Sequence, residues 1–171
     1  ITNQKFEEAS KVYEKILLKK PPRTIKIKIN FQLGEIYSIY LNDFDKSIEH
    51  FNQIVNESNE PKWQVDALEK IANIYFSDLK NYKKSAEIYL KLKIFFPVLD
   101  KQNLYSFRYA ESLINQREYS KSIKLFEVIK TQKSEYAIRS YYNIGLANFY
   151  KKDYEKALDN WFEYLKREKR S

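Results

Sequence analysis

Apolar residues recur at steps of three and four along most of the chain, which is the spacing of one face of an α-helix. Leu33, Ile36, Tyr37 and Tyr40 follow this spacing, and polar or proline-containing breaks separate such stretches. Successive helices are expected to pair, so the predicted fold class is all-α. The pattern predicts first helices over Thr24–Leu41, Lys62–Leu79, Lys101–Gln116 and Ala137–Lys151, and second helices over Lys5–Lys19, Asp45–Val55, Tyr82–Ile94, Ser120–Ile129 and Tyr154–Lys166.

A pattern of an aromatic, a small and a second aromatic residue recurs five times, each time within a predicted second helix or beginning one residue before it. Its first members are Phe6, Phe44, Tyr82, Tyr119 and Tyr154, at intervals of 38, 38, 37 and 35 residues. A near-constant period in this range is typical of a solenoid of stacked helix pairs. The small member lets two helices approach closely, and the second aromatic fills the gap between pairs. The small and second aromatic members, all expected to be structural, are Ala9/Tyr13, Ser47/Phe51, Ser85/Tyr89, Ser122/Phe126 and Ala157/Trp161.

Proline, asparagine and aspartate stand at the predicted helix ends. Proline lacks a backbone donor and restrains the residue before it, whereas Asp and Asn side chains accept hydrogen bonds from nearby backbone N–H groups. Pro21-Pro22 and Pro97 are therefore expected to follow helices, and Pro61 to begin one. Short turns within the pairs are predicted at Asn42-Asp43, Lys80-Asn81, Glu118 and Lys152-Asp153.

The composition argues against an enzyme and against a bound cofactor or metal. The chain has no cysteine, so it can form neither a disulfide nor a thiolate metal site. His50 is the single histidine, and we expect it at the surface of a second helix. Gly34 and Gly145 are too far apart for a phosphate-binding loop, and no residues have zinc or calcium spacing. No catalytic residues are therefore predicted.

The net charge of +8 raises the alternative of nucleic-acid or anionic-surface binding. Aromatic residues are plentiful, and bases stack on aromatic rings. The basic residues, however, fall mostly on turns and solvent faces with Glu and Asp among them, which favours an ordinary solvated surface over a nucleic-acid site. The candidate basic groups are Lys26/Lys28, Lys83/Lys84, Lys151/Lys152 and residues 166–170.

The repeated residues resemble the tetratricopeptide repeat motif, W-x2-L-G-x2-Y followed by A-x3-F and P. From Gly34 to Phe44 there are 10 residues, as from Ala72 to Tyr82, whereas the two later repeats have 9. The first two full repeats thus carry an extra residue before the turn. The matches are Leu33-Gly34, Tyr37, Ser47 and Phe51; Ile71-Ala72, Tyr75, Ser85, Tyr89 and Pro97; Tyr109-Ala110, Leu113, Ser122 and Phe126; and Tyr141, Ile144-Gly145, Ala157 and Trp161.

The resemblance implies a right-handed α-solenoid of antiparallel helix pairs, forming one domain over 1–171. Residues 1–20 would be the second helix of a truncated repeat, followed by repeats at 24–58, 62–97, 100–133 and 137–168. Such proteins hold other proteins, so the implied function is a non-enzymatic scaffold. The helices at both ends of the predicted solenoid lack the polar capping segments that solenoids usually have. Either sequence outside this chain or another chain in an oligomer would cover them.

In this family the first helices line a concave groove, and the resemblance places large apolar groups there. The implied partner is a peptide or an amphipathic helix. The alternative is that these apolar side chains pack against one another inside the protein. Groove and core are equally favoured for Phe31 and Phe107, whereas the core is favoured for Ile114 and Leu146. Some members of this family bind the C-terminal carboxylate of a partner with Lys, Asn and Arg side chains. Here only Asn73 occupies a comparable position, and the negative charge of Glu69 beside it would repel a carboxylate. The proposed groove residues are Phe31, Glu35, Asn73, Phe76, Phe107, Glu111, Tyr142 and Phe149.

Residues 84–97 resemble a phrase found in tetratricopeptide proteins of bacterial envelopes, including outer-membrane assembly lipoproteins. The resemblance implies an envelope or periplasmic location. No apolar run approaches the roughly 20 residues of a membrane helix, so membrane attachment would require an anchor outside this sequence. The chain contains no methionine and opens at Ile1, so we expect it to be a fragment or a matured product.

Overall fold

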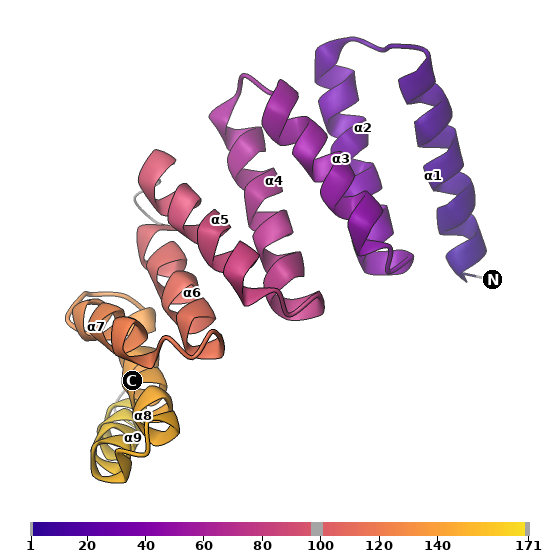
Figure 1. Ribbon diagram of the computed structural model, residues 1–171. Helices are drawn as coiled ribbons and strands as arrows, with labels where there is room; N and C mark the ends of the chain where they lie inside the picture. Colours follow the sequence, from indigo (N-terminus) through magenta and orange to yellow (C-terminus); the bar gives the residue numbers. More distant parts are fainter. Residues whose placement is uncertain (1, 97–100, 170–171) are drawn as a thin grey trace. The chain divides into compact units, whose positions relative to one another are not determined.

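The computed structural model describes residues 2–96 and 101–169, and every regular element in these ranges is helical (Figure 1). The all-α prediction is confirmed. The chain divides into two compact units, 1–80 and 81–171. The first contains α1 (Thr2–Leu18), α2 (Arg23–Glu35), η1 (Ile36–Tyr40), α3 (Phe44–Glu57), α4 (Pro61–Asn73) and η2 (Ile74–Asp78); the second contains α5 (Tyr82–Phe95), α6 (Gln102–Asn115), α7 (Tyr119–Ile129), α8 (Tyr136–Tyr150) and α9 (Tyr154–Glu168).

The predicted polar turns are confirmed as helix starts. Asp43, Asn81 and Asp153 each precede a helix and accept a hydrogen bond from the backbone N–H three residues on. Glu118 precedes α7 without making such a bond. Pro61 is the first residue of α4, where its missing N–H costs nothing. Pro97, predicted to end a helix, lies outside the described residues.

The extra residue before the first two turns takes the form of a π-helical turn. The backbone N–H of Leu41 donates to the Ile36 carbonyl oxygen at 3.1 Å, and that of Leu79 donates to Ile74 at 3.0 Å. A π turn accommodates one additional residue within a helix without displacing the residues after it. Helices α6 and α8, whose repeats have the shorter spacing, continue to their ends as α-helices.

The core of the first unit explains why position 34 is glycine. Phe51 has no exposed surface, and a Cβ atom built on Gly34 would lie 2.6 Å from its ring. The Ser47 hydroxyl donates to the Gly34 carbonyl oxygen at 2.7 Å, so the small residue of the motif both permits and fixes the close approach of α2 and α3. The predicted reason for small residues is confirmed here.

Unit 2 uses the same device. Ser122 is fully buried, and its hydroxyl donates to the Ala110 carbonyl oxygen at 2.9 Å. A Cβ atom on Gly145 would lie 2.5 Å from Trp161 and 3.0 Å from the carbonyl oxygen of Ala157. Trp161 itself is only half-buried. The core cluster of this unit comprises Phe107, Ala110, Ile114, Phe126, Ile129, Ile144 and Ala147.

Phe107 belongs to this core, so its assignment to an open groove needs correction. Its ring has no exposed surface and meets the rings of Phe126 and Tyr136 at centroid distances of 5.3 and 5.0 Å. The alternative of internal packing therefore holds at this position. Ile114 is buried as expected, and Leu146 packs against the same cluster.

None of the helices within the described ranges has the length and apolar character needed to cross a membrane.

Candidate protein-binding surfaces

In the first unit, Phe31 and Glu35 lie one helical turn apart on α2. The Phe31 ring makes edge contacts with Phe51 and Trp63, each at a centroid distance of 5.6 Å. The ammonium group of Lys70, on α4, lies 5.6 Å from the same ring. Phe31 is partly buried, and its ring contacts two aromatic side chains and one cation. Its role as a partner contact stays a prediction.

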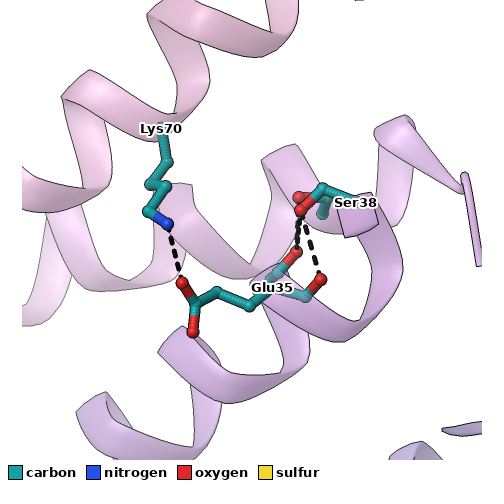
Figure 2. A network of polar contacts seen from close by, with 5 residues as sticks. Glu35, Ser38 and Lys70 are labelled. Atoms are coloured by element: carbon teal, nitrogen blue, oxygen red, sulfur yellow. Dashed lines mark hydrogen bonds and ion pairs between the residues drawn. The ribbon is translucent and has the colours of Figure 1, made fainter. Parts of the chain in front are cut away.

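Lys70 also pairs with Glu35 and so ties α4 to α2. Figure 2 shows the Lys70 Nζ reaching toward the Glu35 carboxylate, with Ser38 nearby; the Nζ to Oε1 distance is 2.6 Å. The Ser38 hydroxyl donates to the Gly34 carbonyl oxygen at 2.9 Å. Because both side chains remain partly exposed, the pair contributes at most about 1 kcal/mol to stability. Its larger effect is to offset the negative charge of Glu35 on this face. Asn73 is exposed and Phe76 partly buried.

In the second unit, two of the predicted groove residues line a real cavity. It has a volume of about 250 Å³ and is lined by side chains from α6, α8 and α9: Glu111, Arg139, Tyr142, Asn143 and Tyr164. Glu111 and Tyr142 are the predicted members. Asn143 and Tyr164 were not predicted. Asn143 follows the predicted groove residue Tyr142 on α8, and Tyr164 lies on α9, the second helix of its pair.

The charges around this cavity are unevenly compensated. Arg108 donates to Glu111 at 2.9 Å, and the Glu111 side chain is 16% exposed. The Arg139 guanidinium lies 4.9 Å above the centroid of the Phe107 ring. The Tyr164 hydroxyl donates to Glu168 at 2.7 Å. This bond, with a smaller effect of desolvation, raises the pKa of Tyr164 above its ordinary value, so the phenol stays protonated at neutral pH.

Phe149 does not line the cavity. It is 45% exposed near the end of α8, where its ring meets those of Tyr154 and Trp161 at 5.6 and 5.9 Å. Four of the eight residues proposed from the sequence lie in unit 1 and four in unit 2. Within unit 2 they divide between a cavity, an aromatic cluster and the core.

A polar pocket of about 330 Å³ beside α1 was not predicted. The Tyr37 hydroxyl donates to Glu14 at 2.5 Å across it, and the Lys46 ammonium group lies 4.9 Å from the Tyr37 ring centroid. The His50 ring stacks on the Tyr37 ring, nearly parallel to it, with the two centroids 5.6 Å apart. His50 is thus partly buried rather than a surface residue, and burial lowers its pKa.

The Asn30 carboxamide favours one tautomer of this histidine. The amide group of Asn30 donates to the Lys26 carbonyl oxygen, which turns its Oδ1 atom toward His50 Nδ1 at 2.9 Å. An oxygen acceptor requires a donor, so Nδ1 carries the proton of the neutral ring. Within the described residues, no group of three or more His, Cys, Asp or Glu side chains could hold a metal ion.

The model of the tetratricopeptide repeat family matches residues 27–60 and 138–160. These two segments are similar to tetratricopeptide repeats. The two matched segments include Gly34 with Phe51 and Gly145 with Ala157, the close approaches described above. A search of curated proteins finds no match.

Solved structures with a similar fold cover nearly all of this chain. A crystal structure of MamA has a TM-score of 0.71 at 19% identity, covering 99% of this chain and 92% of that one. The repeats of a putative kinesin light chain from Podosopora anserina give 0.71 at 10% identity, covering 95% and 87%. YrrB, described as a TPR protein with an unusual peptide-binding site, gives 0.70 at 16% identity, covering 95% and 78%. At these identities the similarity establishes the fold, a solenoid of helix pairs.

Proposed function

We propose that this chain is a non-enzymatic scaffold that binds a peptide or an amphipathic helix of a partner protein on the faces of its first helices. The observation that carries the proposal is the cavity of unit 2, because first helices α6 and α8 contribute Glu111, Arg139, Tyr142 and Asn143 to one concave site. Tyr142 is 47% exposed there, and a tyrosine can anchor a partner with its ring and hydroxyl together.

Two further observations support the proposal. Tetratricopeptide repeats recur in protein-binding scaffolds, and the structural relative YrrB has a peptide-binding site. In the first unit, the face of α2 and α4 also offers a partly exposed aromatic ring, Phe31, beside a charged side chain, Lys70. An aromatic surface with charged groups at its edge is the usual composition of a protein-binding site.

The proposal is tested by comparing the proteins that variants capture from an extract of the source organism, identified by mass spectrometry. Tyr142→Ala removes the exposed anchor of the cavity. Val128→Ala is the control, because Val128 is an exposed apolar residue on the second helix α7. Wild type and Val128→Ala should capture the same partner, and Tyr142→Ala should lose it. Equal capture by all three would reject the cavity as the binding site.

The alternative of nucleic-acid binding has weaker support, because several lysines already have acidic partners. Lys26 pairs with Glu57 at 2.5 Å, and Lys121 and Lys156 pair with the acidic residues three positions before them. Binding to phosphates would weaken steeply as salt rises. A salt titration of any binding to single-stranded DNA or RNA therefore separates this alternative from the scaffold.

The proposed location is the bacterial envelope, supported by the resemblance of residues 84–97 to envelope members of the family. Fractionation of the source cells, followed by immunoblotting, tests it. Recovery in the cytoplasmic fraction alone would reject the location and leave the scaffold proposal untouched.

A further inference from the structure

We propose that an exposed apolar stripe on α9 pairs with the same stripe of a second copy of this chain, with the two helices antiparallel. The stripe consists of Tyr154, Leu158, Phe162 and Leu165, which are 55, 52, 67 and 49% exposed. It lies on a second helix rather than on the first-helix faces proposed above, so the inference does not depend on the proposed function.

Helix α9 packs on α8 with another part of its circumference. Ala157 is buried, and its carbonyl oxygen and the Trp161 ring are the atoms that approach Gly145. Because successive residues of an α-helix are rotated by about 100°, the stripe is centred about 80° away from Ala157 and Trp161. Its four side chains keep half or nearly half of their surface exposed, or more, so no described helix covers them.

The repeats show that the position of Leu158 is normally covered. It is the fourth residue after the first member of the repeated motif. The equivalent residues of α1, α3 and α5 are buried, and that of α7 packs against the core of unit 2. They are Ser10, Ile48, Ala86 and Ile123, respectively. Leu158 therefore occupies a contact position of the repeat that is still open in α9.

Phe162 shows that the stripe is more than an uncovered repeat position. It is the eighth residue after the first member of the motif, and its equivalents are Glu14, Asn52, Leu90 and Glu127. Three of these four are polar, so a helix that only continued the repeat would usually meet a polar residue at this position. A phenylalanine that is 67% exposed there favours a partner that extends further around α9 and brings an apolar group of its own.

A second copy of α9 provides such a group when it runs antiparallel. The spacing of Leu158, Phe162 and Leu165, four and then three residues, is that of the seam between two paired helices. A two-fold axis at Phe162 brings the two Phe162 rings together. Leu158 lies four residues before this axis and Leu165 three after it, so these leucines of opposite copies differ in height along the helix by only about 1.5 Å. All three seam residues thus meet an apolar side chain.

The charges beside the stripe fit the same arrangement. Exposed along the edge that faces away from α8 are Glu155, Asp159, Lys166 and Lys169. Glu155 and Lys169 lie seven residues before and after the axis, and Asp159 and Lys166 lie three before and four after it. An antiparallel pair therefore sets acidic residues against basic ones, whereas a parallel pair would align like charges. Lys166 already pairs with Glu163 at 3.2 Å, but this pair is exposed and can be exchanged at little cost.

The area of the stripe sets the strength of the pair. With about 200 Å² for each free side chain, the exposed parts amount to roughly 400 Å² on each copy. This is comparable with the largest apolar patch of a typical monomer, which is often functional, and about half of the ~800 Å² that each partner contributes to a standard interface. The dimer should therefore be weak and form only at high protein concentration.

Sedimentation equilibrium of the intact chain tests this pairing. We expect mostly monomer at about 5 µM and mostly dimer at about 300 µM, as for a small interface. Phe162→Asp should weaken the dimer at least about tenfold, because it places a charge at the centre of the seam. Val128→Asp, at an exposed apolar position of α7, is the control and should leave the dimer unchanged. Both residues are exposed, so thermal melts of the two variants should match that of wild type.

Two charge variants test the antiparallel register. Asp159→Lys and Lys166→Asp each set like charges against each other across the pair, so each should weaken the dimer at least about threefold. An equimolar mixture of the two variant chains should recover the wild-type affinity, because each position then faces the opposite charge. Unchanged dimerisation of both single variants would show that these residues do not face one another and would reject the inference.

A chain that stays monomeric at about 300 µM would overturn the inference, as would a dimer that Phe162→Asp leaves intact. Capture of another protein through Phe162 by a monomeric chain would assign the stripe to that protein and equally exclude self-pairing. The proposed function fails or stands separately. Loss of partner capture in Tyr142→Ala says nothing about the dimer, and Phe162→Asp leaves the cavity at Tyr142 in place.

Discussion

Phe107→Ala should destabilise unit 2 by roughly 3 to 5 kcal/mol, the usual cost of truncating a buried phenylalanine. The ring is completely buried and contacts two further rings and the Arg139 guanidinium. Ala110 and Ala147 in the same cluster are small and fully buried, so they cannot extend into the space that the ring leaves. The cavity should therefore stay open and the full cost should be measured.

Urea unfolding followed by circular dichroism measures this change. With a slope of about 2 kcal/mol per molar, the loss corresponds to a midpoint lower by roughly 1.5 to 2.5 M. If two transitions are resolved, the one that belongs to unit 2 should move. Tyr142→Ala, at a half-exposed position, should shift the midpoint by less than about 0.5 M. A comparably small shift for Phe107→Ala would show that the ring is not part of the core and would return it to the groove.

Three other substitutions test separate parts of the structure. Gly34→Ala should lower the unfolding midpoint because its new methyl group collides with the Phe51 ring, and Phe51→Leu in the same chain should recover part of the loss; additive effects would refute the contact. Asp43→Ala should cost about 1 kcal/mol by removing a helix cap, whereas Glu118→Ala, at the equivalent position without a cap bond, should be neutral. The pKa of His50 is lowered by burial, so the unfolded chain protonates first and stability should fall as pH drops from 7.5 to 5.5; an unchanged drop in a His50→Gln variant would exclude this origin.

The repeat pattern predicted most of the fold because each helix buries a periodic face. The aromatic and small residues of the motif mark where helices touch, and Phe51, Gly34 and Ser47 occupy the positions expected of them. The spacing also revealed an extra residue in two repeats. The spacing could not show how the extra residue is accommodated, because a loop longer by one residue and a π-helical turn require the same number of residues.

The candidate site was less predictable, because the register of one helix does not show what covers it. Phe107 occupies a groove position of α6 by counting, yet Tyr136 and Arg139 of α8 close over it. Asn143 lies one position beyond the counted Tyr142, and Tyr164 enters the cavity from a second helix. No local signal in the sequence marks either residue, since both depend on how α6, α8 and α9 meet.

The two π turns, η1 and η2, have a consequence for how this chain tolerates changes in length. Deleting a residue from an ordinary helix rotates everything beyond it by about 100° and turns buried side chains outward. Deleting Ser38 or Ser77 should instead convert the widened turn into a regular one, with the nine-residue spacing that α6 and α8 already have. In η1 and η2 the first unit can therefore accept the insertion or the deletion of one residue. The helices on both sides keep their contacts in either case.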